Sequence, residues 1–328
     1  MMNLGLFPII EPYEEGWLEV EPCHKIYWQQ SGNPQGKPIV LLHGGPGSGI
    51  NQDGRCYFDP EFYRIIAFDQ RGAGRSLPSG ELKNNTTQHL VEDMEKLRAF
   101  FQIEKWLITG GSWGSTLALY YAQTYPNRCQ GLLLRSIFLG RDFEFKWLSH
   151  DVRAVYPDAW DKFVNFIPEE KRGDIIRAYH ELLLDPDPKI HTVAADHCLA
   201  YYGKIYRLFP QIQAHTPHIK DLYSELCLSR IQSHYYVNRL FMGDYNLLDN
   251  MDKISHLPGY IIHGRYDMCC PLLGAFDLSR AWKKAKLIVV PDAAHSNREG
   301  SFPEAIVEAS NELKRRTEDG EQRKEGKV

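Results

Sequence analysis

The residue with the clearest chemical potential in this chain is Ser112, which lies at the centre of a Gly-x-Ser-x-Gly pattern from Gly110 to Gly114. An apolar run precedes the pattern and a helical stripe follows it, so the serine is expected at a sharp strand-to-helix turn. Small residues allow so tight a turn, and the hydroxyl would lie at the positive end of the helix. These features indicate a nucleophile. A small-residue turn that merely contains serine is the alternative.

Two further polar residues complete the order nucleophile, acid, base. Asp267 follows the apolar run at 259–263, and His295 follows the apolar run at 285–290. Catalytic residues of parallel α/β sheets gather at the carboxyl ends of strands, which is where both residues are expected. We expect His295 to take the Ser112 proton through Nε2, and Asp267 to hold Nδ1–H and stabilise the imidazolium. Either residue alone would indicate nothing, but the combination with Ser112 predicts a catalytic triad.

A serine nucleophile also needs two N–H groups aimed at the developing oxyanion. The first is expected from the backbone of Trp113, the residue after the nucleophile. The second is expected from the glycine-rich loop His43-Gly-Gly-Pro-Gly47, where Gly45 is the first choice and Gly44 the second. The alternative for this loop is a tight turn without catalytic use.

Apolar runs and helical stripes alternate along the chain in the order that a parallel sheet requires. An opening hairpin is indicated within residues 17–30. Buried strands are predicted at 38–43, 63–68, 105–109, 130–135, 259–263 and 285–290, and helices at 87–101, 116–125 and 303–315. Thr87 is the predicted N-cap of the first of these helices. The pattern predicts an α/β fold with a parallel sheet flanked by helices.

Residues 141–245 have a different character, because they are rich in aromatic and charged residues and contain no strand-like run. Several amphipathic helices inserted between two parts of one sheet are typical of a cap over an active site. The predicted organisation is therefore a first core part at 1–140, a helical cap at 141–245, a second core part at 246–316 and a polar, disordered tail at 317–328.

Composition narrows the classes of function. The chain has 43% hydrophobic and 24% charged residues, and its net charge of −4 gives no indication of nucleic-acid binding. No apolar run is long enough for a membrane span, and the N-terminus lacks the basic segment of a signal peptide. Seven cysteines without metal-like spacing indicate reduced thiols and a cytoplasmic location. No metal or cofactor is expected, and the sequence does not indicate an oligomeric state.

Several motifs occur together across the predicted core. They are His43-Gly-Gly-Pro-Gly47, Asp69-Gln-Arg-Gly-Ala-Gly-Arg-Ser76, Gly110-Gly-Ser-Trp-Gly-Ser115, Thr116-Leu-Ala-Leu-Tyr-Tyr-Ala-Gln-Thr-Tyr-Pro126, Gly264-Arg-Tyr-Asp267, Cys270-Pro271 and His295-Ser296. In combination they resemble the proline iminopeptidase family of serine peptidases. The resemblance implies an α/β-hydrolase fold, with a mostly parallel sheet flanked by helices and an inserted helical cap. It also implies release of N-terminal proline from small peptides through an acyl-enzyme, without a metal.

The resemblance further suggests four substrate-binding residues. Cys270 matches a cysteine that lines the proline pocket, and Phe138 matches an aromatic wall residue, although ordinary core packing is the alternative for both. Tyr202 and Gln232 stand where the family has glutamates, of which the first helps to bind the free amine of the substrate. A glutamine carbonyl can accept a hydrogen bond from an ammonium group but lacks the charge that makes such a bond strong.

Three functions are compatible with these features. The first is a proline iminopeptidase-like aminopeptidase, and the second is an esterase or amidase on the same scaffold with a relaxed amine requirement. The third is a non-catalytic binding protein that keeps the fold, and the complete set of Ser112, Asp267, His295 and the glycine loop argues against it. Neutral residues at both glutamate positions predict weak discrimination between substrates with a free and a blocked amine.

Overall fold

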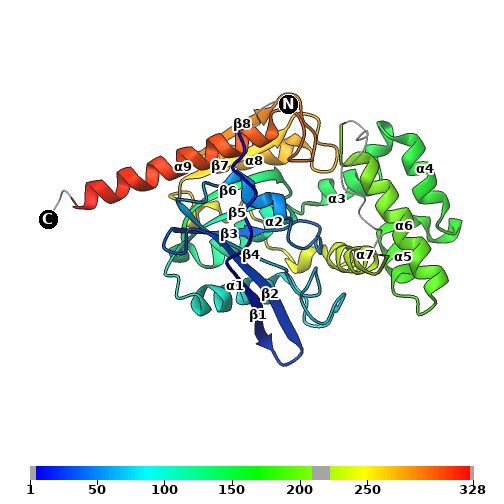
Figure 1. The fold of residues 1–328 in the computed structure, drawn as a ribbon. Coiled ribbons are helices and arrows are strands. Elements are labelled where there is room, and N and C mark those ends of the chain that lie inside the picture. The colour runs from blue at the N-terminus through cyan, green and yellow to red at the C-terminus, as the bar shows by residue number, and fades with distance from the viewer. Residues whose placement is uncertain (1–4, 209–221, 326–328) are drawn as a thin grey trace.

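The computed structural model describes residues 5–208 and 222–325, and its centre is one eight-stranded sheet (Figure 1). The strands are β1 (Glu14–Glu21), β2 (His24–Gly32), β3 (Lys37–Leu42), β4 (Tyr63–Phe68), β5 (Trp106–Ser112), β6 (Cys129–Ile137), β7 (Gly259–Gly264) and β8 (Ala285–Val290). They are arranged in the order β1-β2-β4-β3-β5-β6-β7-β8. β2 pairs antiparallel with β1 and β4, and every later pairing is parallel. The mostly parallel sheet and the opening hairpin are therefore confirmed.

Helices flank this sheet and fill the stretch between β6 and β7. The α-helices are α1 (Thr87–Phe100), α2 (Trp113–Thr124), α3 (Asp142–Ser149), α4 (Pro157–Asn165), α5 (Ile175–Leu183), α6 (Pro188–Ile205), α7 (Leu222–Val237), α8 (Leu272–Ala281) and α9 (Phe302–Glu325). The 3-10 helices are η1 (Gln52–Tyr57), η2 (Pro126–Arg128), η3 (Asp151–Ala154), η4 (Glu169–Asp174), η5 (Arg239–Phe241) and η6 (Met251–Lys253). Within the described parts of the chain, none of the helices combines the length and the apolar character that crossing a membrane requires.

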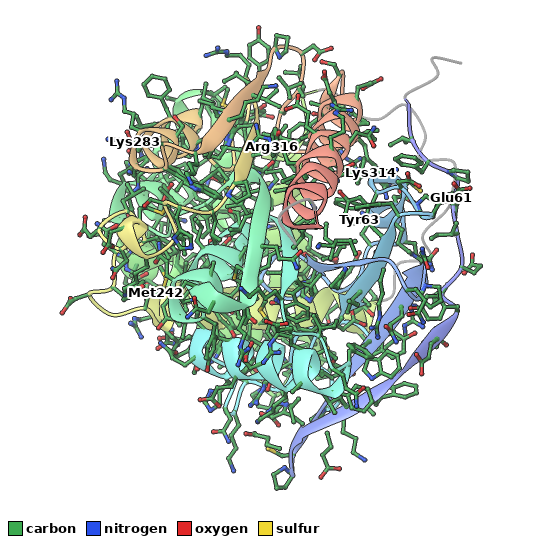
Figure 2. All side chains as sticks on the ribbon, turned by 90° about the vertical axis from the view of Figure 1, so that its left-hand side faces the viewer. Glu61, Tyr63, Met242, Lys283, Lys314 and Arg316 are labelled. Carbon is green, nitrogen blue, oxygen red and sulfur yellow. The ribbon has the colours of Figure 1, made fainter. Side chains whose placement is uncertain are left out.

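The sheet separates two apolar clusters. On one face, buried residues of α1, α2 and α8 pack against the strands, including Met94, Leu117 and Leu278. The opposite face is covered mainly by η1 and α9. There the Tyr63 hydroxyl donates to the Ser310 carbonyl at 2.8 Å, and Figure 2 shows Tyr63 near Lys314 of α9. The central strands are thus covered on both faces, which explains their continuous apolar runs.

The stretch between β6 and β7 forms a helical block, which we define as α3 to α7. Residues 141–208 and 222–245 contain helices and no strand. Figure 1 shows α4, α5 and α6 together on one side of the molecule, with α7 between them and the sheet. The block has an aromatic centre of its own, because Phe163 stacks on Tyr179 at 4.3 Å and on Tyr201 at 4.2 Å.

Two sequence predictions about helix ends are wrong. Helix α1 is capped by Thr86, whose side chain accepts from the His89 amide, and not by Thr87. The Thr87 hydroxyl instead donates to the Leu240 carbonyl, a partner distant in sequence. The closing helix does not end at residue 315, because α9 continues to Glu325 through a segment rich in Glu, Lys and Arg, which favour helix without an apolar face. The last residues of the predicted tail, 326–328, lie outside the described residues.

Candidate active site

Ser112 lies at the sharp turn between β5 and α2 that its flanking glycines predict. Its backbone has φ 56° and ψ −128°, an uncommon conformation for a residue with a side chain. A Cβ at Gly110 would lie 2.3 Å from the Gly114 carbonyl oxygen, and a Cβ at Gly114 would lie 2.5 Å from the Leu42 carbonyl oxygen. Both glycines are therefore required by close backbone approach, and the turn places Ser112 at the N-terminus of α2.

Asp267 and His295 lie together in the loops after β7 and β8. His295 Nδ1 is 2.8 Å from Asp267 Oδ2 and 3.0 Å from Oδ1, and Oδ1 also accepts from the backbone amides of Cys269 at 2.9 Å and Cys270 at 2.7 Å. Burial acts to raise the pKa of Asp267, but His295 and these donors hold it below its usual value. An ionised Asp267 requires the proton on Nδ1, so Nε2 of His295 is the nitrogen that can accept a proton.

Cys270 connects this pair to Ser112. The Ser112 hydroxyl acts to lower the pKa of the Cys270 thiol against the larger effect of burial, which places the two side chains close together. Its sulfur, a ring nitrogen of His295 and a carboxylate oxygen of Asp267 all lie within 4.8 Å of one another. Burial raises the pKa of the thiol well above its usual value, so Cys270 is a neutral neighbour. Such a cluster can in principle hold a metal ion, but N–H groups already occupy the Asp267 oxygens. The structure therefore brings Ser112, Asp267 and His295 into one site.

The glycine loop after β3 lies beside Ser112. A Cβ at Gly44 would be 3.5 Å from the Ser112 Cβ, and Gly45 has a φ of +110°, which favours glycine. The Gly44 carbonyl accepts from the Ser48 amide at 3.2 Å and from His43 Nδ1 at 3.0 Å. In a trans peptide the N–H points away from the C=O, so these two donors fix the direction of the Gly45 N–H.

Gln70, which was not among the predicted site residues, joins this loop to the residue after the nucleophile. Its Nε2 donates to the His43 carbonyl at 3.0 Å, and its Oε1 accepts from Trp113 Nε1 at 2.8 Å. Its backbone amide donates to His43 Nε2 at 2.9 Å, which leaves the His43 proton on Nδ1. A buried glutamine directly after a strand could have indicated such a bridge.

The charged residues of the same motif hold the surrounding loops. The Asp69 carboxylate accepts from the Ile50 amide at 2.5 Å and from the Arg75 amide at 2.8 Å. Arg71 forms two hydrogen bonds with Asp93 of α1, at 2.6 and 2.7 Å, and both side chains are fully buried. This segment therefore fastens the glycine loop to the rest of the core.

A group of aromatic residues lies on one side of Cys270. The Phe138 ring lies 5.6 Å from Phe145 and 6.3 Å from Tyr236, and Phe145 lies 5.6 Å from Tyr236. Cys270 contributes to the electrostatic environment of the Tyr236 hydroxyl, which places the two side chains close together. Phe138 belongs to this aromatic group, and Cys270 lies beside its Tyr236 member. Tyr236 was not predicted, since nothing in its own segment indicates the partners that the fold supplies.

Tyr202 and Gln232 both lie near Tyr236. Burial raises the pKa of Tyr202 well above its usual value, and the nearby Tyr236 raises it further. Tyr202 is therefore a neutral phenol. Gln232 Nε2 lies 3.4 Å from the Tyr236 hydroxyl and donates to the Gly45 carbonyl at 3.0 Å. The two residues are on the helical block, in α6 and α7, and both contribute neutral groups.

His263, at the end of β7, is a further residue that was not predicted. Its Nδ1 accepts from the Ile137 amide at 3.0 Å, so Nε2 carries the proton and donates to the Cys270 carbonyl at 2.8 Å. Burial lowers the pKa of His263 although Asp267 opposes this shift, so the imidazole is neutral. It thereby supports the segment that donates to the Asp267 carboxylate.

Known proteins are similar to this chain in sequence and in fold. The chain matches the family described as alpha/beta hydrolase fold over residues 37–298. A probable proline iminopeptidase of Leptolyngbya boryana is 46% identical over 307 residues, which cover 93% of this chain and 95% of that protein. A proline iminopeptidase of Arabidopsis thaliana is also 46% identical, over 94% of this chain and 82% of that protein. This chain belongs to the proline iminopeptidase family.

Solved structures support the fold of this proline iminopeptidase family member. A proline iminopeptidase of Mycobacterium smegmatis superposes with a TM-score of 0.63 at 18% identity, over 93% of this chain and all of that one. An esterase of Exiguobacterium antarcticum superposes with a TM-score of 0.58 at 19% identity, over 92% of this chain and all of that one. The α/β-hydrolase fold and the resemblance noted in the sequence are thus confirmed.

Proposed function

We propose that the protein is a serine aminopeptidase that releases N-terminal proline from small peptides. Ser112 attacks the carbonyl carbon of the substrate, and His295 Nε2 takes its proton while Asp267 holds the imidazolium. The backbone amides of Trp113 and Gly45 bind the oxyanion, with Gly44 as the alternative donor. His295 then protonates the leaving amine, and a water molecule hydrolyses the acyl-enzyme. The observation that carries the proposal is the buried Asp267–His295 pair, which shares the neighbouring Cys270 with Ser112.

The residues near Ser112 suit a compact apolar ring at the acyl position. Cys270 neighbours both Ser112 and Tyr236, and Tyr236 packs with Phe138 and Phe145, so apolar surface close to the serine would favour proline over a flexible polar side chain. The names of the relatives also support proline as the released residue. In this proposal the helical block acts as a cap that closes the site. None of the seven cysteines, which all lie in the described residues, forms a disulfide, and this supports a reducing, cytoplasmic location.

A second candidate is an esterase or amidase that does not require a free amine. The observation in its favour is that Tyr202 and Gln232 are both neutral, whereas burial of an ammonium group is costly without a charged or multiple acceptor. Peptides, simple amides and esters would then all be substrates. The acyl-enzyme chemistry is the same for both candidates, so only the amine distinguishes them.

Hydrolysis of a proline arylamide, an alanine arylamide and a short acyl ester by the wild type and Ser112→Ala tests the chemistry. We expect the proline arylamide to be preferred over the alanine arylamide, and Ser112→Ala to lower kcat by several orders of magnitude, since removal of a triad member leaves only binding and oxyanion stabilisation. Circular dichroism of the variant should be unchanged. Near-wild-type turnover by Ser112→Ala would exclude the serine mechanism, and ester hydrolysis without arylamide hydrolysis would favour the second candidate.

The amine requirement is tested by kcat/KM for a free-amine proline substrate against its N-acetyl counterpart. With Tyr202 and Gln232 at the amine subsite, we expect discrimination well below the roughly thousandfold that a desolvated charge contact can give. Glu225 is the carboxylate that could bind the amine instead. Its Oε2 is buried without a hydrogen-bond partner, and it lies about two turns before Gln232 on α7, so Glu225→Gln is the control. Thousandfold discrimination that disappears in Glu225→Gln would contradict the neutral subsite and assign amine binding to Glu225.

A further inference from the structure

The Gly45 carbonyl, on the glycine loop of the core, is held by two side chains of α7. Gln232 Nε2 donates to it at 3.0 Å, and the Tyr236 hydroxyl lies at 3.5 Å. A backbone carbonyl can only accept, so the amide nitrogen of Gln232 must face it and the amide oxygen must face away. Gln232 is therefore engaged with the loop, in addition to any contact that its oxygen makes with a substrate.

This contact acts on the residue that we propose as an oxyanion donor. On its N-terminal side, the Gly45 peptide is fixed by the two donors to the Gly44 carbonyl, His43 Nδ1 and the Ser48 amide. On its C-terminal side, the Gly45 carbonyl accepts a hydrogen bond from Gln232, which lies closer to it than the Tyr236 hydroxyl. Gly45 has no side chain and a φ of +110°, so its conformation depends on its backbone hydrogen bonds.

The helix that carries Gln232 also lies against the neighbouring part of the loop. A Cβ at Gly47 would lie 3.0 Å from Ile231 Cβ, so the two backbones approach closely there. Further along α7, the Tyr235 hydroxyl donates to Asn85 Oδ1 at 2.9 Å, and His234 Nε2 donates to the Asn85 carbonyl at 3.0 Å. Gln232 is thus presented to Gly45 from a helix that is itself fixed to the core.

We propose that Gln232 is a positioning residue for the oxyanion hole, through which the helical block fixes the orientation of Gly45. This role rests on the proposed acyl-transfer function, but it does not depend on the substrate having an amine. Gln232 can affect catalysis in two ways, by binding the substrate amine and by holding the Gly45 carbonyl. A glutamate here could accept from an ammonium group, but when ionised it has no hydrogen to donate to the Gly45 carbonyl. The residue that improves amine binding would therefore loosen the oxyanion loop.

The test uses a short acyl ester without an amine, so that amine recognition cannot contribute. Gln232→Met keeps the length of the side chain but has no donor, and Gln232→Glu replaces the donor with an acceptor. We expect kcat to fall by about 10-fold in Gln232→Met and further in Gln232→Glu, with KM changed by less than about twofold. Loss of one oxyanion donor costs about 10²–10³ in kcat, and a donor that is loosened rather than removed should cost less. The affinity of an aldehyde inhibitor, which forms a tetrahedral adduct with the serine, should fall in parallel.

Asn238→Asp is the matched control. It makes the same amide-to-carboxylate change at an exposed position directly after α7, where the side chain bonds only its own helix, and should leave kcat unchanged. Wild-type kcat on the ester in Gln232→Met, or a higher kcat in Gln232→Glu, would overturn the proposal. A fall confined to free-amine substrates would also overturn it, because that result assigns Gln232 to amine binding alone. If the wild type hydrolyses the ester but no prolyl arylamide, the proposed function fails while this test remains decisive.

Discussion

At the scale of single residues, the site depends on neutral side chains that hold backbone groups in place. Gln70 is the clearest example, because one amide bonds both the His43 carbonyl and the Trp113 indole. His263 and Gln232 act similarly on the Cys270 and Gly45 carbonyls. The contacts of Gln70 and Gln232 join segments that are distant in sequence, whereas His263 reaches the loop that directly follows its own strand.

Replacement of Gln70 by methionine tests this arrangement. The variant keeps the side-chain volume but leaves the buried Trp113 N–H and His43 carbonyl without their partner, so we expect a loss of about 1–3 kcal/mol in the free energy of unfolding. We also expect kcat to fall by roughly 10-fold with little change in KM, measured well below the melting temperature. Gln88→Met is the control, since Gln88 also bonds a backbone carbonyl but is exposed and lies on α1. Unchanged stability and kcat in Gln70→Met would contradict the bridge.

The positions of Ser112, Asp267 and His295 could be predicted because each follows an apolar run that ends in a loop. Strand ends gather at one edge of a parallel sheet, so sequence order alone indicated that these residues would meet. The roles of Gln70, His263 and Tyr236 could not be predicted in the same way. Their partners come from other elements, and the type of a single polar or aromatic residue does not indicate which backbone carbonyl it will reach.

At the scale of elements, apolar periodicity predicted most strands and helices. The two wrong predictions concern helix ends, which depend on hydrogen bonds and helix propensity and not on apolar periodicity. The α1 N-cap shifted from Thr87 to Thr86 because the Thr87 hydroxyl bonds Leu240 across the molecule. Helix α9 extends beyond its apolar stripe because helix propensity continues after burial ends. Periodicity reports the buried face of an element and carries little information about its ends.

The turn of the β1–β2 hairpin makes a contribution to stability that depends on pH. Hydrogen bonds from Cys23 and Asn84 and the charge of Arg71, 3.2 Å away, outweigh partial burial and lower the pKa of Glu21 from 4.5 to about 2. Because the folded pKa is below the unfolded value, the unfolded chain binds the extra proton first as the pH falls. This stabilisation is complete above about pH 4.5 and is lost as the pH falls towards 2.

Glu21→Gln should remove this pH dependence. We expect the wild type to lose about 1 kcal/mol more than the variant between pH 5 and pH 3 in urea unfolding, less than a fully enclosed group would lose, since solvent reaches Glu21. Glu19→Gln, on the same strand and exposed, serves as the control and should follow the wild type. Parallel pH profiles for the wild type and Glu21→Gln would show that the turn contributes nothing in this range.

At the scale of the whole molecule, α7 connects the helical block to the core. Besides the bond to Gly45, it contributes the Tyr235 hydroxyl, which donates to Asn85 Oδ1, and both residues are buried. Trp113 packs against the Tyr235 ring with centroids 4.9 Å apart, directly behind the nucleophile turn. A connection of this kind should make the block and the core unfold together.

Tyr235→Phe tests the coupling by leaving the buried Asn85 oxygen without this donor. We expect a loss of about 1–3 kcal/mol and a melting temperature lower by a few degrees, seen by calorimetry as one shifted transition. Tyr266→Phe, at a side chain that is 45% exposed, should change stability by less than about 0.5 kcal/mol. Two separate transitions, of which only one shifts, would show that the block and the core are independent units.

The Asp267 carboxylate, which orients His295, is bound by the backbone amides of Cys269 and Cys270 and not by their side chains. Any residue except proline presents the same N–H group, so substitutions at these two positions can reshape the acyl pocket and leave the Asp267 hydrogen bonds in place. Substitutions at Cys269 are therefore compatible with an unchanged Asp267–His295 pair, whereas a substitution at Cys270 also replaces the thiol beside Ser112. The same two codons are the natural starting point for a library that selects new substrates on this scaffold.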